Sequence, residues 1–465
     1  MSALLIEARH VVHGSADGRA VADGGAGWVE IDGGLITAVG TGDASDERRA
    51  AAGERIDAGH GAVMPGFVNA HTHLFQTFFR GLRDDLEHSE WNSRVIGDNV
   101  GKLTEEDFYL AALLGSIENL MAGCTTVVDN HYVHTSSKNT DRVAEAMGES
   151  GVRGWLARGT IDRRDVLTRT TGRLAAEANT EPIDQSLGEL ERIAGNWHHT
   201  SHGRIRISAA VQAAWAASPQ LLARLTTFAH DNGLLLHAHC AETQTSDRRS
   251  HDVHGCSEIE AFERSGFLGV GTQLVHGVWL GDAGMAIAAA HQCGVVHCPV
   301  SNAYLASGVA PIQALRSLGI PVALAADGSA SNHRQDPFEA MKVATLLQRA
   351  VERDATIMCP EETLAMAWHG GAAVLGRAGH LGVLAPGAAA DVIVVDLDKA
   401  NIEPMHRLTS ALVFCATPGD VRHVIVDGQI VVRDRVPTTV DLPALLTRCR
   451  DRIAQLNLSA AGPQR

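Results

Sequence analysis

The chain has 465 residues, a formal net charge of −15 and a hydrophobic content of 45%. This length exceeds that of a usual single domain, and the hydrophobic content is enough for a large core and a second, smaller one. The negative charge repels phosphate backbones and anionic lipids, so we expect neither nucleic acid nor a membrane surface as a partner.

The N-terminal sequence and the cysteines predict the compartment. The run Met1–Arg9 reaches an acidic residue before any apolar core of signal-peptide length, and no run is long enough to cross a bilayer. The 8 cysteines are scattered without a Cys-x-x-Cys motif or a tight framework, which is typical of reduced thiols. We therefore expect a cytoplasmic protein.

The two ends of the chain predict one small β domain. Residues 1–60 and 389–438 both contain short alternating segments separated by glycine-rich turns, a pattern typical of antiparallel β structure. Neither piece is large enough to form a good core alone, so we expect them to pack together as a β-sandwich. Residues 439–465 are expected to form a C-terminal helical tail.

Between these ends, residues 61–388 alternate short β-branched runs with helical stretches, which predicts a parallel sheet wrapped in helices. One predicted helix covers 103–121, where Thr104 precedes an acidic first turn, and another covers 336–353. Eight such units predict an α/β fold, a TIM (β/α)8 barrel with catalytic groups at the carboxyl ends of its strands. The predicted strands are 65–73, 124–130, 152–159, 204–212, 234–240, 272–277, 294–299 and 321–327.

Polar residues stand at the ends of several of these strands. His71 and His73 are two residues apart, so a strand would point both imidazoles to the same side. His239 and Glu242 end a later strand, and His276 and Asp327 end two others. Each could alone have an ordinary role as a loop carboxylate, a core histidine or a turn cap, but their common position favours one site.

These residue types suit a catalytic metal. His71, His73, His239 and Asp327 would supply nitrogen and oxygen ligands to one divalent cation and leave a position for water, whose pKa the metal lowers. Glu242 would take a proton from this water and deliver it to a leaving group, and His276 would hold the water or polarise the substrate. The predicted fourth strand, 204–212, has no lysine that could bridge two metals, so we expect one metal per chain.

Six sequence motifs resemble those of the amidohydrolase superfamily, in the branch of heterocycle deaminases and triazine hydrolases. The resemblance implies that His71, His73, His239 and Asp327 bind Zn²⁺ or Fe²⁺, that Glu242 is the proton shuttle and that His276 contacts water or substrate. His237 would then be an extra histidine on the strand of His239. The motifs are Pro65–His73, His237–Thr243, Leu274–Gly277, His297–Asn302, Asp327–Asn332 and Gly382–Val392.

Within this branch, Phe79–Leu86, Glu90-Trp91 and Asp336–Lys342 resemble the methylthioadenosine and S-adenosylhomocysteine deaminases. Two positions depart from that resemblance. Counting back from Leu103 places Val100 where those enzymes hold the ribose hydroxyls with a glutamate, and Gln212 replaces their histidine at the end of the fourth strand. A buried valine cannot pair with hydroxyls, so the sequence disfavours a nucleoside.

Other segments, His73–Thr77 and Asp327–Asn332, resemble the 8-oxoguanine deaminases, although Thr72 departs from their histidine triplet. The candidates for reading the substrate ring are Gln76, Trp91, Arg158 and Gln212, with packing or loop structure as the alternative role.

The sequence thus predicts a cyclic amidine hydrolase that deaminates a small heterocycle, such as an oxidised purine, pterin, pyrimidine or triazine. Deamination of an adenosine derivative and dehalogenation of a triazine are alternatives, and Glu242 counts against the second because chloride leaves without a proton. A non-catalytic ligand-binding barrel is a third alternative that the complete ligand set disfavours. We expect a homodimer or higher homo-oligomer.

Overall fold

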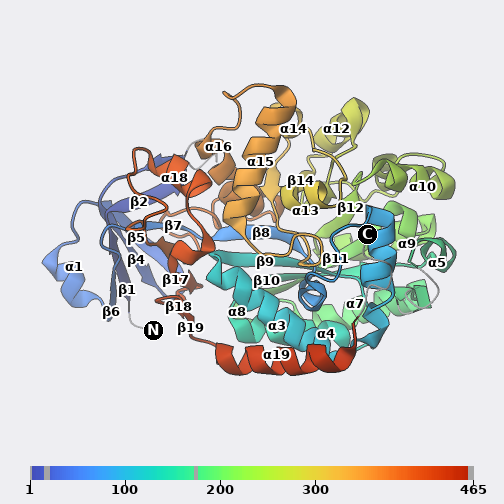
Figure 1. Ribbon diagram of the computed structural model, residues 1–465, viewed down its shortest axis with the longest axis horizontal. Helices are drawn as coiled ribbons and strands as arrows, with labels where there is room; N and C mark the ends of the chain where they lie inside the picture. The colour runs from blue at the N-terminus through green and yellow to red at the C-terminus, as the bar shows by residue number, and fades with distance from the viewer. Residues whose placement is uncertain (1–2, 15–20, 172–175, 178, 459–465) are drawn as a thin grey trace.

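The computed structural model describes residues 3–14, 21–171, 176–177 and 179–458 (Figure 1). The other residues, which include part of the predicted N-terminal β segment and the end of the predicted tail, lie outside the described residues. Sheets built from the two chain ends occupy one side of the molecule, and a helix-covered barrel occupies the other (Figure 1).

Eight parallel strands of the described chain form one sheet in sequence order, from β8 to β15. Beyond the last strand, the amide of Asp327 donates to the carbonyl of His71 at 3.0 Å, which brings the two edges together into a nearly closed barrel. The predicted (β/α)8 fold is confirmed. The strands are β8 (Phe67–Thr72), β9 (Cys124–His131), β10 (Arg153–Thr160), β11 (Ile205–Ala213), β12 (Leu236–Cys240), β13 (Thr272–His276), β14 (Gly294–His297) and β15 (Val322–Leu324).

The predicted first barrel strand, 65–73, proves to cover parts of two strands. Pro65 ends β7 (Ala62–Pro65), which pairs with β16 (Val392–Val395) in the smaller part of the molecule. Gly66 separates β7 from β8, and a Cβ at this position would lie 2.2 Å from the side chain of Thr125. The chain therefore passes from the small sheets into the barrel at a residue that must be glycine.

Two sheets form the smaller part, and both chain ends contribute to the larger one. Buried side chains from both chain ends, among them Ile6, Val29, Val392 and Ile425, share one apolar cluster. The sheet orders are β5-β4-β1-β6 and β19-β18-β17-β16-β7-β2-β3. The strands not yet given are β1 (Leu4–Ala8), β2 (His10–Gly14), β3 (Val21–Asp23), β4 (Gly27–Asp32), β5 (Leu35–Thr41), β6 (Glu54–Asp57), β17 (Val421–Val426), β18 (Gln429–Arg433) and β19 (Val436–Pro437).

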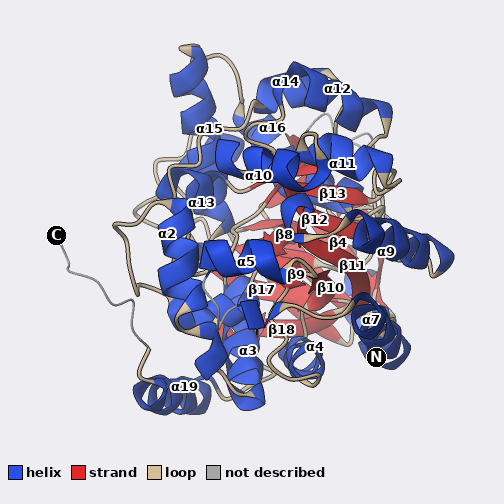
Figure 2. Cartoon of the chain, turned by 90° about the vertical axis from the view of Figure 1, so that its right-hand side faces the viewer, coloured by secondary structure: helices blue, strands red, loops and turns tan. Residues whose placement is uncertain are grey.

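Helices surround the barrel strands (Figure 2). The predicted caps are present, because Thr104 and Asp107 form a reciprocal capping box on α3 and the Asp336 carboxylate accepts from the amide of Glu339 on α15. The longer helices are α3 (Glu105–Met121), α4 (Asn139–Ser150), α5 (Arg164–Thr171), α7 (Ile183–Trp197), α9 (Pro219–Asp231), α10 (Gln244–His254), α12 (Gly281–Ala290), α15 (Pro337–Glu352) and α19 (Leu442–Leu456), the last within the predicted tail. The shorter ones are α1 (Asp46–Ala51), α2 (His88–Trp91), α8 (Thr200–Gly203), α11 (Glu258–Arg264), α13 (Pro299–Tyr304), α14 (Ile312–Ser317), α16 (Pro360–Ala365), α17 (Gly371–Val374) and α18 (Leu408–Phe414).

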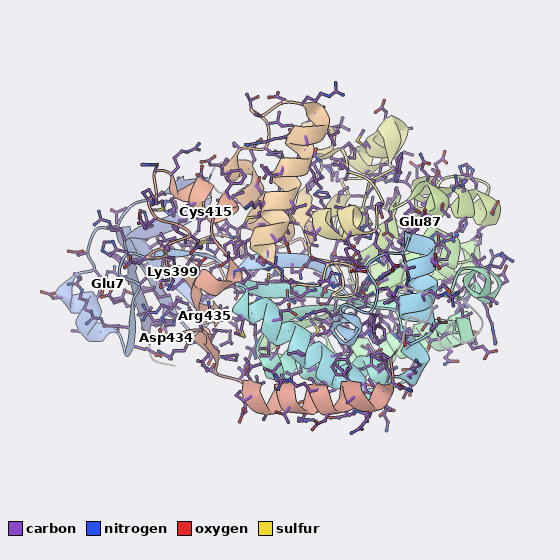
Figure 3. All side chains as sticks on the ribbon, viewed as in Figure 1. Glu7, Glu87, Lys399, Cys415, Asp434 and Arg435 are labelled. Atoms are coloured by element: carbon purple, nitrogen blue, oxygen red, sulfur yellow. The ribbon has the colours of Figure 1, made fainter. Side chains whose placement is uncertain are left out.

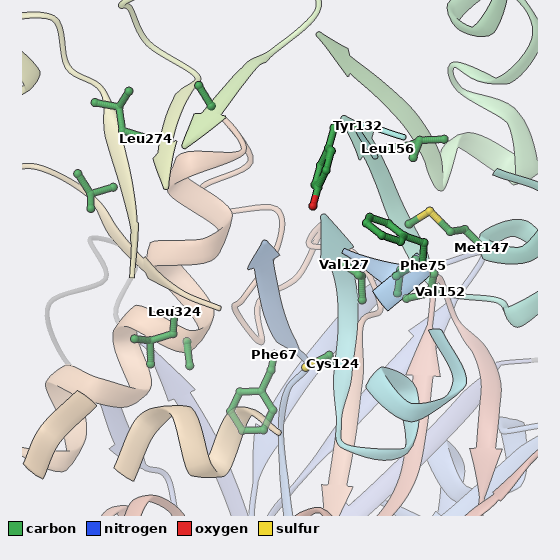
Figure 4. Packing of buried hydrophobic residues seen from close by; sticks show 14 of the residues in the cluster. Phe67, Phe75, Cys124, Val127, Tyr132, Met147, Val152, Leu156, Leu274 and Leu324 are labelled. Carbon is green, nitrogen blue, oxygen red and sulfur yellow. The ribbon is translucent and has the colours of Figure 1, made fainter. Parts of the chain in front are cut away.

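The barrel core separates an apolar base from a polar end. Phe67, at the start of β8, packs edge-on against Phe338 with ring centroids 5.1 Å apart and stacks on Trp368 at 6.0 Å. Figure 4 shows Phe67 next to Cys124, with Leu324 close by. The polar residues follow at the other ends of these strands. No described helix has the length and apolar character needed to span a membrane.

Candidate active site

The four predicted metal ligands converge at the carboxyl ends of three strands. His71 Nε2 and His73 Nε2, from β8 and the residue after it, lie 3.4 and 3.5 Å from Asp327 Oδ1, beyond β15. His239 Nε2, from β12, lies 3.3 Å from His73 Nε2. The ligand atoms of His71, His73 and Asp327 lie within 4.8 Å of one another, as do those of His71, His239 and His276, so these side chains surround a common point with the ligand spacing of a metal site.

Backbone carbonyls fix two of these imidazoles. His73 Nδ1 donates to the carbonyl of Asn130 at 2.7 Å, and His239 Nδ1 donates to the carbonyl of Gln212 at 2.5 Å. A ring that donates from Nδ1 carries its lone pair on Nε2 when neutral. Both rings therefore turn an electron pair toward the common point.

A second histidine fixes the orientation of His71. His71 Nδ1 lies 2.9 Å from His237 Nε2, and His237 Nδ1 lies 2.8 Å from Gln273 Oε1. The amide oxygen of Gln273 can only accept, so His237 donates to it from Nδ1. The Nε2 of neutral His237 then accepts from His71 Nδ1, which leaves His71 Nε2 unprotonated. The extra histidine of the sequence motif thus orients His71, one of the predicted ligands.

The electrostatics of the ligands suit a cation. Burial lowers the pKa of all three histidines, that of His239 to about 3, so the rings are neutral and their lone pairs are free. His71 Nε2 is buried and has no hydrogen-bond partner among the described residues, a costly arrangement for a polar atom unless a ligand fills it. These residues therefore fit a divalent metal.

Asp327 is held by the residue that follows it and by Ser301 of the motif His297–Asn302. Its Oδ1 accepts from the amide of Gly328 at 2.6 Å, and its Oδ2 accepts from the hydroxyl of Ser301 at 2.7 Å. Burial acts to raise the pKa of Asp327, but the neighbouring imidazoles of His71 and His73 hold it well below the usual value. The carboxylate is therefore ionised.

Glu242 faces the ligand cluster from the loop that follows β12. Its Oε2 lies 3.2 Å from His88 Nε2 and 3.8 Å from His276 Nε2, and the Nδ1 of His276 is 2.9 Å from Asn302 Oδ1. Burial acts to raise the pKa of Glu242, but the charges of His276 and His88 lower it to about 2. The carboxylate of Glu242 is therefore ionised.

Three non-glycine residues at these strand ends have left-handed backbone. The φ angles are +52° at Ala241, +75° at His276 and +66° at Asp327. Such angles disfavour residues with a Cβ by about 1–3 kcal/mol, and they cluster where a site requires a particular side-chain direction.

A cavity opens onto the cluster. Three of the four residues predicted to bind the substrate ring, Gln76, Trp91 and Gln212, line this cavity. The lining residues are His73, Gln76, His88, Trp91, Asn92, Tyr132, Gln212, His239, Glu242, His276, Leu305, Asp327 and Ser331.

Gln76 reaches the cavity because Gly328 has no side chain. A Cβ at Gly328 would lie 1.9 Å from Gln76 Oε1. The glycine of the Asp327-Gly328 pair therefore leaves the space that this amide occupies.

Two sequence-based inferences need correction. Arg158 is outside the cavity wall, because its buried guanidinium turns to Glu181 and pairs with it at 2.8 Å. Val100 lies in the 3-10 helix η3 (Val100–Lys102), fully buried in the hydrophobic core and outside the cavity wall. The absence of a glutamate at position 100 therefore does not indicate whether the site binds a ribose.

The sequence reasoning missed five lining residues. Tyr132 directly follows the end of β9 and packs edge-on against Phe75 with centroids 5.5 Å apart (Figure 4), so the strand-end rule that identified the ligands could have found it. His88, Asn92, Leu305 and Ser331 come from connecting segments that have no periodic pattern.

The model of the amidohydrolase family matches residues 62–431. The 5-methylthioadenosine/S-adenosylhomocysteine deaminase of Desulforudis audaxviator is 35% identical over 395 residues, 85% of this chain and 87% of the relative. A zinc-bound adenosine deaminase structure from Xanthomonas campestris has 27% identity and a TM-score of 0.85, covering 97% and 98% of the two chains. Zinc-bound atrazine chlorohydrolase from Arthrobacter aurescens has 25% identity and a TM-score of 0.89, covering 97% and 100%. The chain belongs to the amidohydrolase family, in the branch that contains these deaminases and triazine hydrolases.

Proposed function

We propose that this protein is a metal-dependent aminohydrolase that releases ammonia from an adenosine derivative such as 5′-methylthioadenosine. The observation that carries the proposal is that Glu242 lines the same cavity as His73, His239 and Asp327, three of the four predicted metal ligands. The 35% identity to a deaminase of this substrate class supports the choice of substrate.

His71, His73, His239 and Asp327 would hold the metal, and three neutral imidazoles with one carboxylate suit a single Zn²⁺ ion. When bound, such an ion activates water and polarises the substrate. The zinc in the similar adenosine deaminase and atrazine chlorohydrolase structures supports this metal.

Glu242 and His276 perform the proton transfer and the positioning. Glu242 takes a proton from the attacking water while the water oxygen bonds to the ring carbon that bears the amino group. The carbon–nitrogen bond then breaks, and the proton on Glu242 goes to the amine, which leaves as ammonia. His276, oriented by Asn302, stands beside Glu242 to hold the incoming oxygen.

The ring itself would lie between the cavity walls. Gln76 Oε1 and Gln212 Oε1 are buried without a hydrogen-bond partner among the described residues, so both are free to accept from the substrate. On an adenine ring the matching donor is the exocyclic amino group, because the ring nitrogens N1, N3 and N7 carry no hydrogen. The indole of Trp91, fixed by its Nε1–H bond to the carbonyl of Ala330 at 3.2 Å, offers an apolar face.

The sequence-based preference for a free heterocycle loses its main support. It rested on Val100, which is in the core, while Asn92 and Ser331 offer polar groups to ribose hydroxyls in the cavity wall. A free heterocycle is the second candidate, because the described wall has no carboxylate besides Glu242 and Asp327 to bind a ribose.

A substrate panel separates these candidates. We expect metal-loaded protein to show a higher kcat/KM for 5′-methylthioadenosine, S-adenosylhomocysteine, 5′-deoxyadenosine or adenosine than for any free purine, pterin, pyrimidine or triazine, measured by ammonia release. A free heterocycle leaves the site groups that would bind the ribose hydroxyls unpaired, at a cost of about 1–3 kcal/mol for each buried group, so the preference should be about tenfold or more. A free heterocycle at the head of the panel would overturn the nucleoside assignment.

A further inference from the structure

We propose that His88 is a positioning residue that holds the carboxylate of Glu242 in its working orientation. This inference rests on the proposed function, because it assigns His88 a role in the proton transfer that Glu242 performs. It comes from the contact between the short helix α2 and the loop after β12.

The geometry points to a directed contact. His88 Nε2 lies 3.2 Å from Glu242 Oε2, within hydrogen-bond distance, whereas His276 Nε2 lies 3.8 Å from the same oxygen, beyond it. The terminal torsion of a glutamate is broad and nearly free, so a carboxylate without a close donor samples many orientations. A bond to Oε2 fixes the plane of the group and leaves Oε1 for the reacting atoms.

Helix α2 is held where His88 can make this contact. The His88 ring stacks on Trp91 with centroids 6.5 Å apart and planes inclined by 29°, and Trp91 is anchored to Ala330. Figure 3 shows Glu87, the residue before His88, at the end of the barrel far from Glu7 of the small sheets. His88 itself lines the cavity wall.

The role differs from that of a simple wall residue. A wall residue would contribute to substrate binding, so its replacement would raise KM. A residue that orients Glu242 affects the proton transfer itself, so its replacement lowers kcat at an unchanged KM. Its effect also disappears once Glu242 can no longer transfer protons, because the two residues then share no function.

Two substitutions and one double variant test the proposal. His88→Phe keeps a flat ring but removes the donor, and His88→Gln places an amide nitrogen near the position of Nε2. With the best substrate of the panel, we expect His88→Phe to lower kcat about tenfold with KM changed less than about twofold, and His88→Gln to restore most of the rate. In the Glu242→Gln background, His88→Phe should have no further effect on kcat.

The outcomes separate this inference from the proposed function. Normal kcat for His88→Phe, equal losses for the Phe and Gln variants, or a full effect in the Glu242→Gln background would each overturn the role of His88. If the wild-type protein deaminates nothing in the panel, the proposed function fails, and this inference fails with it. Metal content and the thermal midpoint of each variant confirm that it is folded.

Discussion

Glu242→Gln is expected to keep the fold and the metal and to lower kcat by about 10²–10⁴-fold. The substitution preserves the shape of the side chain, but an amide cannot accept the proton of the attacking water. The native carboxylate is ionised at neutral pH and so free to accept a proton, since the charges of His276 and His88 overcome the effect of burial and lower its pKa to about 2. Single-turnover measurement should place the loss in the chemical step.

A nearby carboxylate provides the control for this experiment. Glu258 is also buried, but its Oε2 accepts from the amide of Ala241 at 2.9 Å and lies outside the cavity wall. Glu258→Gln should therefore lower kcat far less than Glu242→Gln. Wild-type turnover by Glu242→Gln on the best substrate would show that another group moves the proton.

Replacing His71 and His239 together by alanine is expected to abolish metal binding and turnover. Each substitution removes one imidazole from a set of four ligands, and a mononuclear site with two ligands left holds its metal weakly. Elemental analysis should find about one equivalent of metal per chain in the active wild-type protein and almost none in the double variant.

Chelation gives the matching control. Removal of the metal from the wild-type protein by a chelator should abolish ammonia release, and added Zn²⁺ should restore it. The double variant should respond to neither treatment. Two equivalents of metal in active protein, or full occupancy in the double variant, would contradict the mononuclear site.

The sequence predicted the barrel and the clustering of the predicted ligands because both follow from local rules. Strand runs bounded by glycine and polar residues located β8 to β15 to within a few residues. In a parallel barrel all carboxyl strand ends meet on one face, so His71, His239 and Asp327 could be placed together without knowledge of side-chain positions. Capping residues such as Thr104 and Asp336 fixed helix starts for the same local reason.

The cavity wall was harder to predict because tertiary contacts decide it. Arg158 has the strand-end position of a site residue, yet its guanidinium pairs with Glu181, which lies 23 residues further along the chain. Val100 was placed by an ungapped count across a connection that contains the short helix α2 and a π-helical stretch, so sequence spacing did not give its location. His88 reaches Glu242 only because that connection folds over the barrel, and no periodic pattern marks such a contact.

We propose that Glu242 takes a proton from the water that displaces ammonia from the ring of an adenosine derivative. The most direct test incubates metal-loaded wild-type protein and Glu242→Gln with 5′-methylthioadenosine in water labelled with heavy oxygen, followed by mass spectrometry of the product and assay of ammonia. We predict one labelled oxygen in each product molecule and an equal amount of ammonia with the wild type, and almost no product with the variant. Product without label, ammonia without product, or equal rates for both proteins would contradict the account.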